Sequence, residues 1–189
     1  PESIAALEPR AKNYTHRDIA DERLDYWLKP EKEAEINFDI RFGWTAAPYF
    51  INSYRSGESE VVDELHRQGI AVGFFFFERA AAVSPEAAEA LDRTIIADFR
   101  GMLSETAPGA ASVVGEAFSE RRCYVEVMLW DSDRVFEAVQ NWSSQASNVR
   151  AAAFRSYRRP AGILFFKSAD RSKNASDAGD IADEADEVS

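Results

Sequence analysis

The sequence predicts an α/β (α+β) fold, a mixed sheet of five or six strands with helices packed on both faces. The first reason is the order of the patterns, because segments of helical and strand periodicity alternate along the 189 residues. The second is the apolar segment 70–77, which ends in four consecutive phenylalanines. Because side chains alternate sides along a strand, two of these rings point to each face, so both faces of the sheet must be covered.

Residues 1–35 predict an N-terminal helical extension. Its helix is expected at 18–28, where apolar residues have roughly the spacing of one helix face. The adjacent Tyr26 and Trp27 favour docking of this helix on the domain, because large aromatic side chains seldom stay unpacked. The single domain itself is predicted to span residues 36–167.

The domain begins with a predicted strand at 36–44, where apolar and polar residues alternate with a period of two. An aromatic loop segment follows at 49–54. A helix is expected at 59–68, with Gly69 in the left-handed position that ends many helices. This helix leads directly into the strand at 70–77. The order of strand, helix, glycine and strand predicts a parallel crossover unit.

The second half of the domain predicts a ferredoxin-like split βαβ unit. Ser84 and Pro85 are typical of the first residues of a helix, and the next 20 residues have helical periodicity. The predicted elements are a strand at 70–78, a helix at 84–107, a hairpin at 112–130, a helix at 132–142 and a strand at 149–157. A short final strand is expected at 163–167.

The segment 149–157 is ambiguous in sequence. Its three consecutive alanines favour a helix, whereas the polar break before it and the hairpin-like turn at 159–162 favour a strand. We favour the strand. Residues 168–189 predict a disordered acidic tail, because a segment of serine, aspartate, alanine and glycine buries too little apolar surface to offset its ordering entropy.

Charge and hydropathy limit the expected partners. The chain has a formal net charge of −11, and a negative surface repels nucleic acid and anionic membranes. The longest apolar run has eight residues, too few to cross a bilayer, and the first residues do not resemble a secretory signal. A soluble, cytoplasmic protein without membrane contact is expected.

The sequence predicts neither a metal nor a cofactor. His16 and His66 are the only histidines and Cys123 is the only cysteine, so the spacing of metal-ligand motifs is missing. The glycines are isolated and form no phosphate-binding loop. Cys123 alternates with three aliphatic residues of its strand, which predicts an inert buried thiol.

Carboxylates at the ends of two predicted strands are the best candidates for a ligand pocket. Glu78 ends one strand and Asp131 ends another, with Arg79 beside the first. If the two strands run in the same direction, these side chains converge at one sheet end, where ligands of open α/β sheets bind. A purely structural role for these residues is preferred over a ligand pocket, because Asp131 is also an expected helix cap and strand ends are polar in any case.

Aromatic and basic residues give two further candidate surfaces. Trp44, Tyr49 and Tyr54 lie in or beside the predicted aromatic loop and are candidates for a protein interface, although burial in the core is the more common fate of such residues. A predicted basic patch consists of Arg150, Arg155, Arg158 and Arg159. On a strand Arg155 faces one side, while Arg150 and Arg158 face the other, so the patch is divided.

Three functions remain open, and the sequence leaves undecided whether the chain is an enzyme. The first is a regulatory or inhibitory protein-interaction domain, with a protein partner or a second copy of the chain bound at a sheet edge or the aromatic loop. The second is a small-molecule-binding protein or atypical enzyme with a carboxylate and arginine pocket at the sheet end. The third, ranked last, is nucleic-acid binding through Arg150–Arg159.

Overall fold

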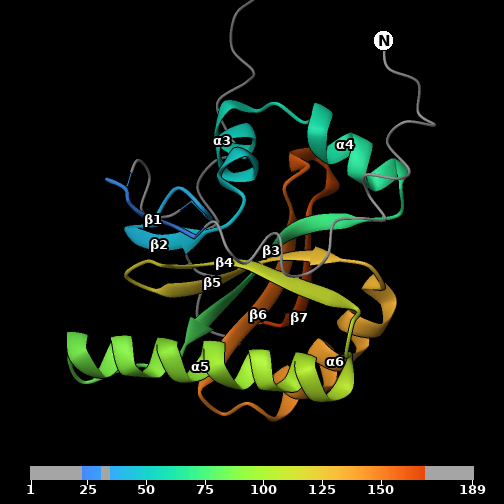
Figure 1. Cartoon of the computed structure of the whole chain (residues 1–189). Helices are drawn as coiled ribbons and strands as arrows, with labels where there is room; N and C mark the ends of the chain where they lie inside the picture. The colour runs from blue at the N-terminus through green and yellow to red at the C-terminus, as the bar shows by residue number, and fades with distance from the viewer. Residues whose placement is uncertain (1–22, 31–34, 169–189) are drawn as a thin grey trace, which may run out of the picture.

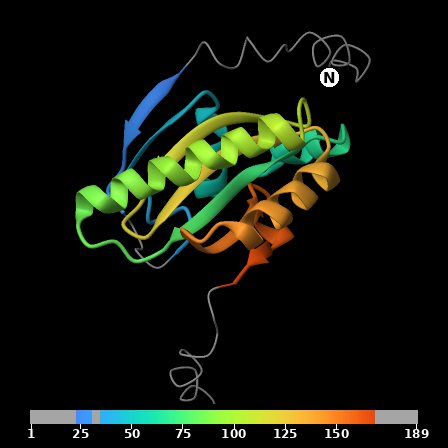
Figure 2. The ribbon, with the colours of Figure 1, turned by 90° about the horizontal axis from the view of Figure 1, so that it is seen from below.

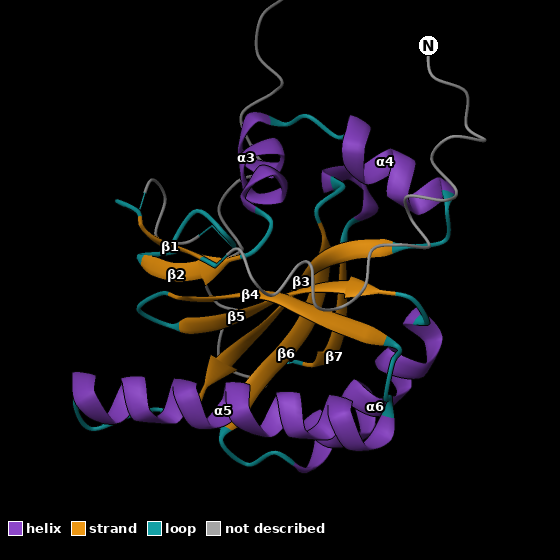
Figure 3. Ribbon diagram, in the orientation of Figure 1, coloured by secondary structure: helices purple, strands orange, loops and turns teal. Residues whose placement is uncertain are grey.

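A computed structural model describes residues 23–30 and 35–168 of the chain (Figure 1). Within these residues the fold is α+β, with one open sheet and helices on both of its faces (Figure 3). The strands are β1 (Leu24–Trp27), β2 (Phe42–Thr45), β3 (Ala71–Arg79), β4 (Ala111–Phe118), β5 (Arg122–Leu129), β6 (Val149–Ser156) and β7 (Ile163–Lys167). The helices are α3 (Pro48–Ser56), α4 (Glu60–Arg67), α5 (Pro85–Thr106) and α6 (Ser132–Gln145), with a 3₁₀ turn η2 (Arg159–Ala161).

The seven strands have the order β1-β2-β4-β5-β3-β6-β7, and every neighbouring pair is antiparallel. The expected mixed sheet of five or six strands is therefore corrected to an antiparallel sheet of seven. The predicted parallel crossover is also wrong, because three antiparallel pairings separate β2 from β3 and the two strands therefore run in opposite directions. Local order along the chain could not reveal that β4 pairs with β2.

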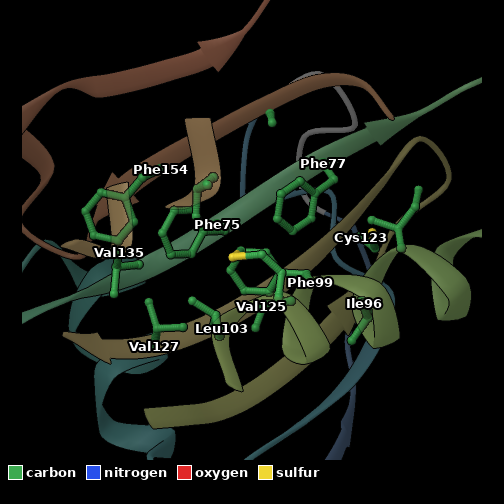
Figure 4. Close-up of a cluster of buried hydrophobic side chains, with 14 of the residues drawn as sticks. Phe75, Phe77, Ile96, Phe99, Leu103, Cys123, Val125, Val127, Val135 and Phe154 are labelled. Carbon is green, nitrogen blue, oxygen red and sulfur yellow. The ribbon is translucent and has the colours of Figure 1, made fainter. Parts of the chain in front are cut away.

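Strand β3 lies inside the sheet and separates two hydrophobic cores, as its phenylalanines predict. Phe75 and Phe77 point toward α5 and α6, whereas Phe74 and Phe76 point toward the face covered by α3 and α4. Figure 4 shows the first core, in which Phe99 of α5 packs on Phe75 and Phe77 with ring centroids 5.0 Å away from each. Seen from below the sheet, α5 and α6 lie across this face (Figure 2).

Local capping signals position three of the helices as predicted. The Ser84 side chain accepts a hydrogen bond from the Ala87 N–H at 3.2 Å and begins α5. Asp131 does the same for α6, accepting from the Arg134 N–H at 3.1 Å. At the end of α4, Gly69 has a φ of +80°, and the Ile70 N–H reaches back to the Leu65 carbonyl.

Two expectations for the N-terminal part are wrong. Residues 24–27, expected in a helix, form strand β1, while the part of that helix before residue 23 lies outside the described residues. The strand expected at 36–44 is reduced to β2, because residues 35–39 form a turn in which Asn37 has a φ of +72°. This segment folds onto the sheet and buries Phe38 and Ile40, but it also buries the polar Asn37 and Asp39 between them, so the alternation does not separate a buried from a solvent-exposed face.

The aromatic segment at 49–54 belongs to helix α3 and not to a loop. Pro48 stands in its first turn and Gly57 ends it with a φ of +84°, so both helix signals were present in the sequence. The segment 149–157 is a strand, as favoured, and β7 also occupies its expected place. The predicted acidic tail lies outside the described residues, apart from Ser168.

Helix α5 carries one glycine that nothing in its surroundings requires. A methyl group on Gly101 would meet no atom within 4 Å. Because glycine has excess conformational freedom in the unfolded chain, we expect Gly101→Ala to raise the free energy of unfolding by about 0.5–1 kcal/mol. Gly109 is the matched control: it has equal space but a φ of +74°, so Gly109→Ala should lose about 1 kcal/mol. Urea unfolding measures both, and two changes of the same sign would contradict this interpretation.

Candidate functional site

The edge strand β1 exposes large apolar side chains. Trp27 is 78% exposed and Leu24 is 51% exposed. Such exposure is unusual for tryptophan, whose large ring surface gains the most from burial. Because β1 is the last strand on its side of the described sheet, only β2 pairs with it among the described residues.

The outer side of β1 also presents backbone groups that no other described strand pairs with. β1 is antiparallel to β2 in a register that sets Leu24 against Thr45, and the Leu28 N–H continues it by donating to the Arg41 carbonyl at 2.8 Å. In an antiparallel pair, alternate residues direct both backbone groups to the same neighbour. Leu24 and Leu28 therefore face β2, while the N–H and C=O groups of Asp25 and Trp27 point away from the sheet.

A groove of about 700 Å³ lies between this edge and α5. Its apolar walls are Trp27 and Phe42 from the first two strands, Phe118 from β4 and Ile96 from α5. Phe42 stacks on Phe118 with ring centroids 4.9 Å apart, so two packed aromatic rings form part of the groove surface. The exposed Trp27 thus stands at the border of a larger apolar surface.

Trp44, predicted as an interface residue, also lines this groove, from β2 and not from a loop. Its indole N–H donates to the Glu116 carboxylate at 3.1 Å, and Arg100 of α5 holds the other Glu116 oxygen at 2.6 Å. The Arg23 guanidinium lies over the Trp44 ring, 5.1 Å from the centroid. These contacts fix Trp44 as one wall of the groove.

The other two predicted interface residues do not join this surface. Both lie on α3, at the opposite face of the sheet. Tyr54 is buried against Phe74 and Tyr157, so it is a core residue. Tyr49 is exposed, with its ring 4.3 Å from that of Phe50. Only Trp44 of the three therefore contributes to the edge.

The predicted carboxylate and arginine residues are divided between the two ends of the sheet. Glu78 and Arg79 line an open cleft of about 1110 Å³, together with Arg150. Asp131 lies beyond the other end of β5, because β3 and β5 are antiparallel and Glu78 pairs with Arg122 at the beginning of β5. The convergence of Glu78 with Asp131 required strands of equal direction and does not occur.

Charges within the sheet-end cleft neutralise one another. Glu78 accepts from Arg150 at 2.8 Å and from Arg122 at 3.4 Å. Arg79 pairs with the buried Asp92 of α5 at 3.1 Å. The cleft therefore presents little uncompensated positive charge to an anionic ligand.

The predicted basic patch is dispersed. Arg150 contacts Glu78 at the sheet end, whereas the Arg155 guanidinium lies over the Tyr54 ring, 5.5 Å from its centroid. Arg158 pairs with Asp63 of α4 at 2.8 Å. The side chain of Arg159 lies outside what the structure describes. Three of the four arginines therefore have separate partners and do not form one basic surface.

Sequence reasoning missed a buried carboxylate in the middle of the sheet. Glu126 of β5 is only 2% exposed, and the Thr45 hydroxyl donates to it at 2.8 Å. The hydroxyls of Tyr157 and Tyr26 also interact with it. Gly115 leaves the space for this carboxylate, because a methyl group there would come within 2.4 Å of a Glu126 oxygen.

Burial is the main cause that raises the pKa of Glu126, to about 7, while the three neighbouring hydroxyls hold it down. The signal in the sequence was a lone charged residue between Val125 and Val127 of an apolar strand. Its alternation with Val125 and Val127 places it on the less apolar face of the strand. That face is in fact covered by α3, α4 and the turn at 35–39.

A second buried polar group lies near Cys123. Asp92 of α5 approaches the thiol and pairs with Arg79, and burial raises the pKa of Asp92 to about 6 despite this arginine. Burial also raises the pKa of Cys123 well above its ordinary value. The expectation of a buried thiol is confirmed, because Cys123 is fully enclosed in the core of Figure 4.

The described residues contain no group of three or more histidine, cysteine, aspartate or glutamate side chains that could hold a metal ion. None of their helices has the length and apolar character needed to span a bilayer.

Comparison with protein-family models, with curated proteins and with solved structures finds no match to this chain.

Proposed function

We propose that this chain is a protein-interaction domain that binds its partner at the open edge of β1. The observation that carries the proposal is Trp27, a largely exposed tryptophan on a strand whose outward backbone groups have no partner among the described residues. An extended polypeptide matches such an edge, because it supplies a complementary row of N–H and C=O groups. Tryptophan is among the residues that most often dominate the affinity of an interface.

A regulatory or inhibitory role is part of this proposal. Strand addition alters the partner by holding a segment of it and needs no chemistry on either side. The groove beside the edge supports selectivity, because its aromatic walls can receive alternate side chains of an added strand.

A carboxylate and arginine pocket at the sheet end ranks second. The size of the cleft favours it, whereas the pairing of Arg79 with Asp92 and of Arg150 with Glu78 counts against an anionic ligand. Nucleic-acid binding ranks third, because the described arginines of 150–158 are directed to different partners.

We also propose that β3, α5, β4, β5, α6 and β6 form a ferredoxin-like split βαβ unit. The strand order β4-β5-β3-β6 and the packing of α5 and α6 on the same core support this proposal. In this interpretation β1 and β2 extend the unit at one edge, which places the interaction surface outside its central four strands.

A capture experiment with two tryptophan variants tests the proposed function. The immobilised wild-type chain and the Trp130→Ala control, whose tryptophan is 40% exposed beyond the end of β5, are expected to retain the same stoichiometric partner. Trp27→Ala should weaken retention at least about tenfold, because a central aromatic anchor contributes about 2 kcal/mol or more to binding.

A backbone variant completes this test. Asp25→Pro removes an outward N–H, which edge strands tolerate, and leaves the hydrogen bonds to β2 in place. It should therefore also weaken retention of the partner. Equal retention by the wild type, Trp27→Ala and Asp25→Pro would refute binding at the β1 edge.

A further inference from the structure

We propose that the partner at this edge is a second copy of the chain, with the two β1 strands paired antiparallel about a two-fold axis at Trp27. The inference rests on the proposed function, because it names the occupant of the same edge. It gives a symmetric dimer with one continuous sheet through both copies. A two-fold interface uses the same surface twice, so that surface must be complementary to itself.

Backbone geometry limits the registers that such a pair can adopt. The outward positions of the edge are Asp25, Trp27 and, by the same alternation, Lys29. For two identical strands to exchange hydrogen bonds, outward residues must lie opposite outward residues. The symmetry axis can therefore pass beside an outward residue or beside the inward residue between two of them, Tyr26 or Leu28. Pro30, which has no N–H to donate, stands at an inward position and does not interrupt this row.

Charge distinguishes between these five registers. An axis at Asp25 sets this carboxylate directly against its own copy, and an axis at Lys29 does the same with two ammonium groups. Like charges directly opposite each other destabilise a strand pair. An axis at Trp27 instead sets Asp25 of each copy against Lys29 of the other, which gives two pairs of opposite charge. An axis at Tyr26 sets Asp25 against Trp27, and an axis at Leu28 sets Trp27 against Lys29, so neither brings opposite charges together. Only the axis at Trp27 does so.

The apolar side chains agree with the same register. At its centre the two Trp27 rings face each other, and each loses solvent contact that it has in the single chain, where it is 78% exposed. On the other face of the sheet, Leu24 lies opposite Pro30 and Tyr26 lies opposite Leu28. The exposed Leu24 thereby also gains an apolar neighbour. Pairing also removes an open sheet edge, which is otherwise a site of uncontrolled association.

Charge reversal tests the register directly. Asp25→Lys sets two lysines against each other in a homodimer, and Lys29→Asp sets two aspartates against each other. Both residues have solvent-exposed side chains, and Asp25 pairs only with the exposed Arg23 at 2.9 Å among the described residues, so the fold should tolerate the changes. Urea unfolding of each variant verifies this. Sedimentation equilibrium over a concentration series measures the dissociation constant of each dimer.

We expect each single variant to raise the dissociation constant at least about tenfold. An equimolar mixture of the two should form mixed dimers, because every lysine then meets an aspartate, and native mass spectrometry with one isotope-labelled chain counts them. The double variant Asp25→Lys/Lys29→Asp should dimerise like the wild type. Recovery in the mixture cannot come from a folding defect of either chain.

Three results would overturn the inference. They are a wild type that stays monomeric at every concentration, single variants that dimerise like the wild type, and a mixture without excess mixed dimers. None of these refutes the β1 edge as an interaction surface, because that proposal depends on the capture experiment with Trp27→Ala and Asp25→Pro. A capture in which the retained partner is the chain itself would support both.

Discussion

The Phe75→Ala chain is expected to lose about 3–5 kcal/mol of unfolding free energy. Phe75 is fully buried, and its ring lies 5.0 Å from that of Phe99 and 5.1 Å from that of Phe154, centroid to centroid. The rings of Phe136 and Phe166 also lie within 6.3 Å. Because these neighbouring rings are carried by both helices and strands, they cannot easily move into the cavity that the missing Phe75 ring leaves. The loss of unfolding free energy should therefore approach the upper part of this range.

Urea unfolding at constant pH measures this loss. Phe165→Ala is the matched control, because the Phe165 ring on β7 is 55% exposed. Its removal leaves little cavity and should cost less than about 1 kcal/mol. Equal losses in the two variants would show that Phe75 is not enclosed between two layers, and the two-core architecture would then be wrong.

The stability of the chain is expected to fall as the pH rises through about 7, on account of Glu126. Burial raises the pKa of this carboxyl from 4.5 to about 7, so between these values the folded chain keeps a proton that the unfolded chain has released. Its contribution to stability is fully present below about pH 4.5 and is lost as the pH rises through 7. The loss is on the order of 3 kcal/mol.

Comparison with Glu126→Gln isolates this contribution. The neutral amide has nearly the same size and cannot titrate. The unfolding free energy of the wild type, relative to that of the variant, should therefore fall by that amount between about pH 4.5 and about pH 8. Chemical unfolding at several pH values gives the difference. Asp92→Asn provides a second carboxyl for comparison: the pKa of Asp92 is raised to about 6, so its smaller contribution should disappear at lower pH. Identical pH profiles for wild type and Glu126→Gln would contradict a buried, titrating Glu126.

Elements defined by local signals were predictable from sequence. Ser84 and Pro85 begin α5, Asp131 begins α6, and Gly69 ends α4, because each acts through backbone groups a few residues away. The phenylalanines of β3 likewise required cover on both faces. Strand order was not predictable, because the pairing of β2 with β4 joins residues 70 to 76 positions apart.

The candidate site was predicted only in part, for two physical reasons. Trp44 was recognised, but Trp27 was assigned to a helix, because four residues of an edge strand are too short to show a period of two. Glu126 was missed because alternation places it on the less apolar side of β5, where a carboxylate does not stand out. Whether such a face is wet depends on α3 and the turn at 35–39, which come from a distant part of the chain.

The space that Gly115 leaves for Glu126 has a consequence for how this sequence can diverge. A larger residue at position 115 would collide with a carboxylate oxygen and with the Trp44 carbonyl, 2.8 Å from the added carbon. Shortening residue 126 would remove only the first of these contacts, because the Trp44 carbonyl belongs to the backbone of the neighbouring strand. In descendants of this chain we therefore expect residue 126 to vary while position 115 stays glycine, and a buried glutamate at 126 to occur only beside that glycine.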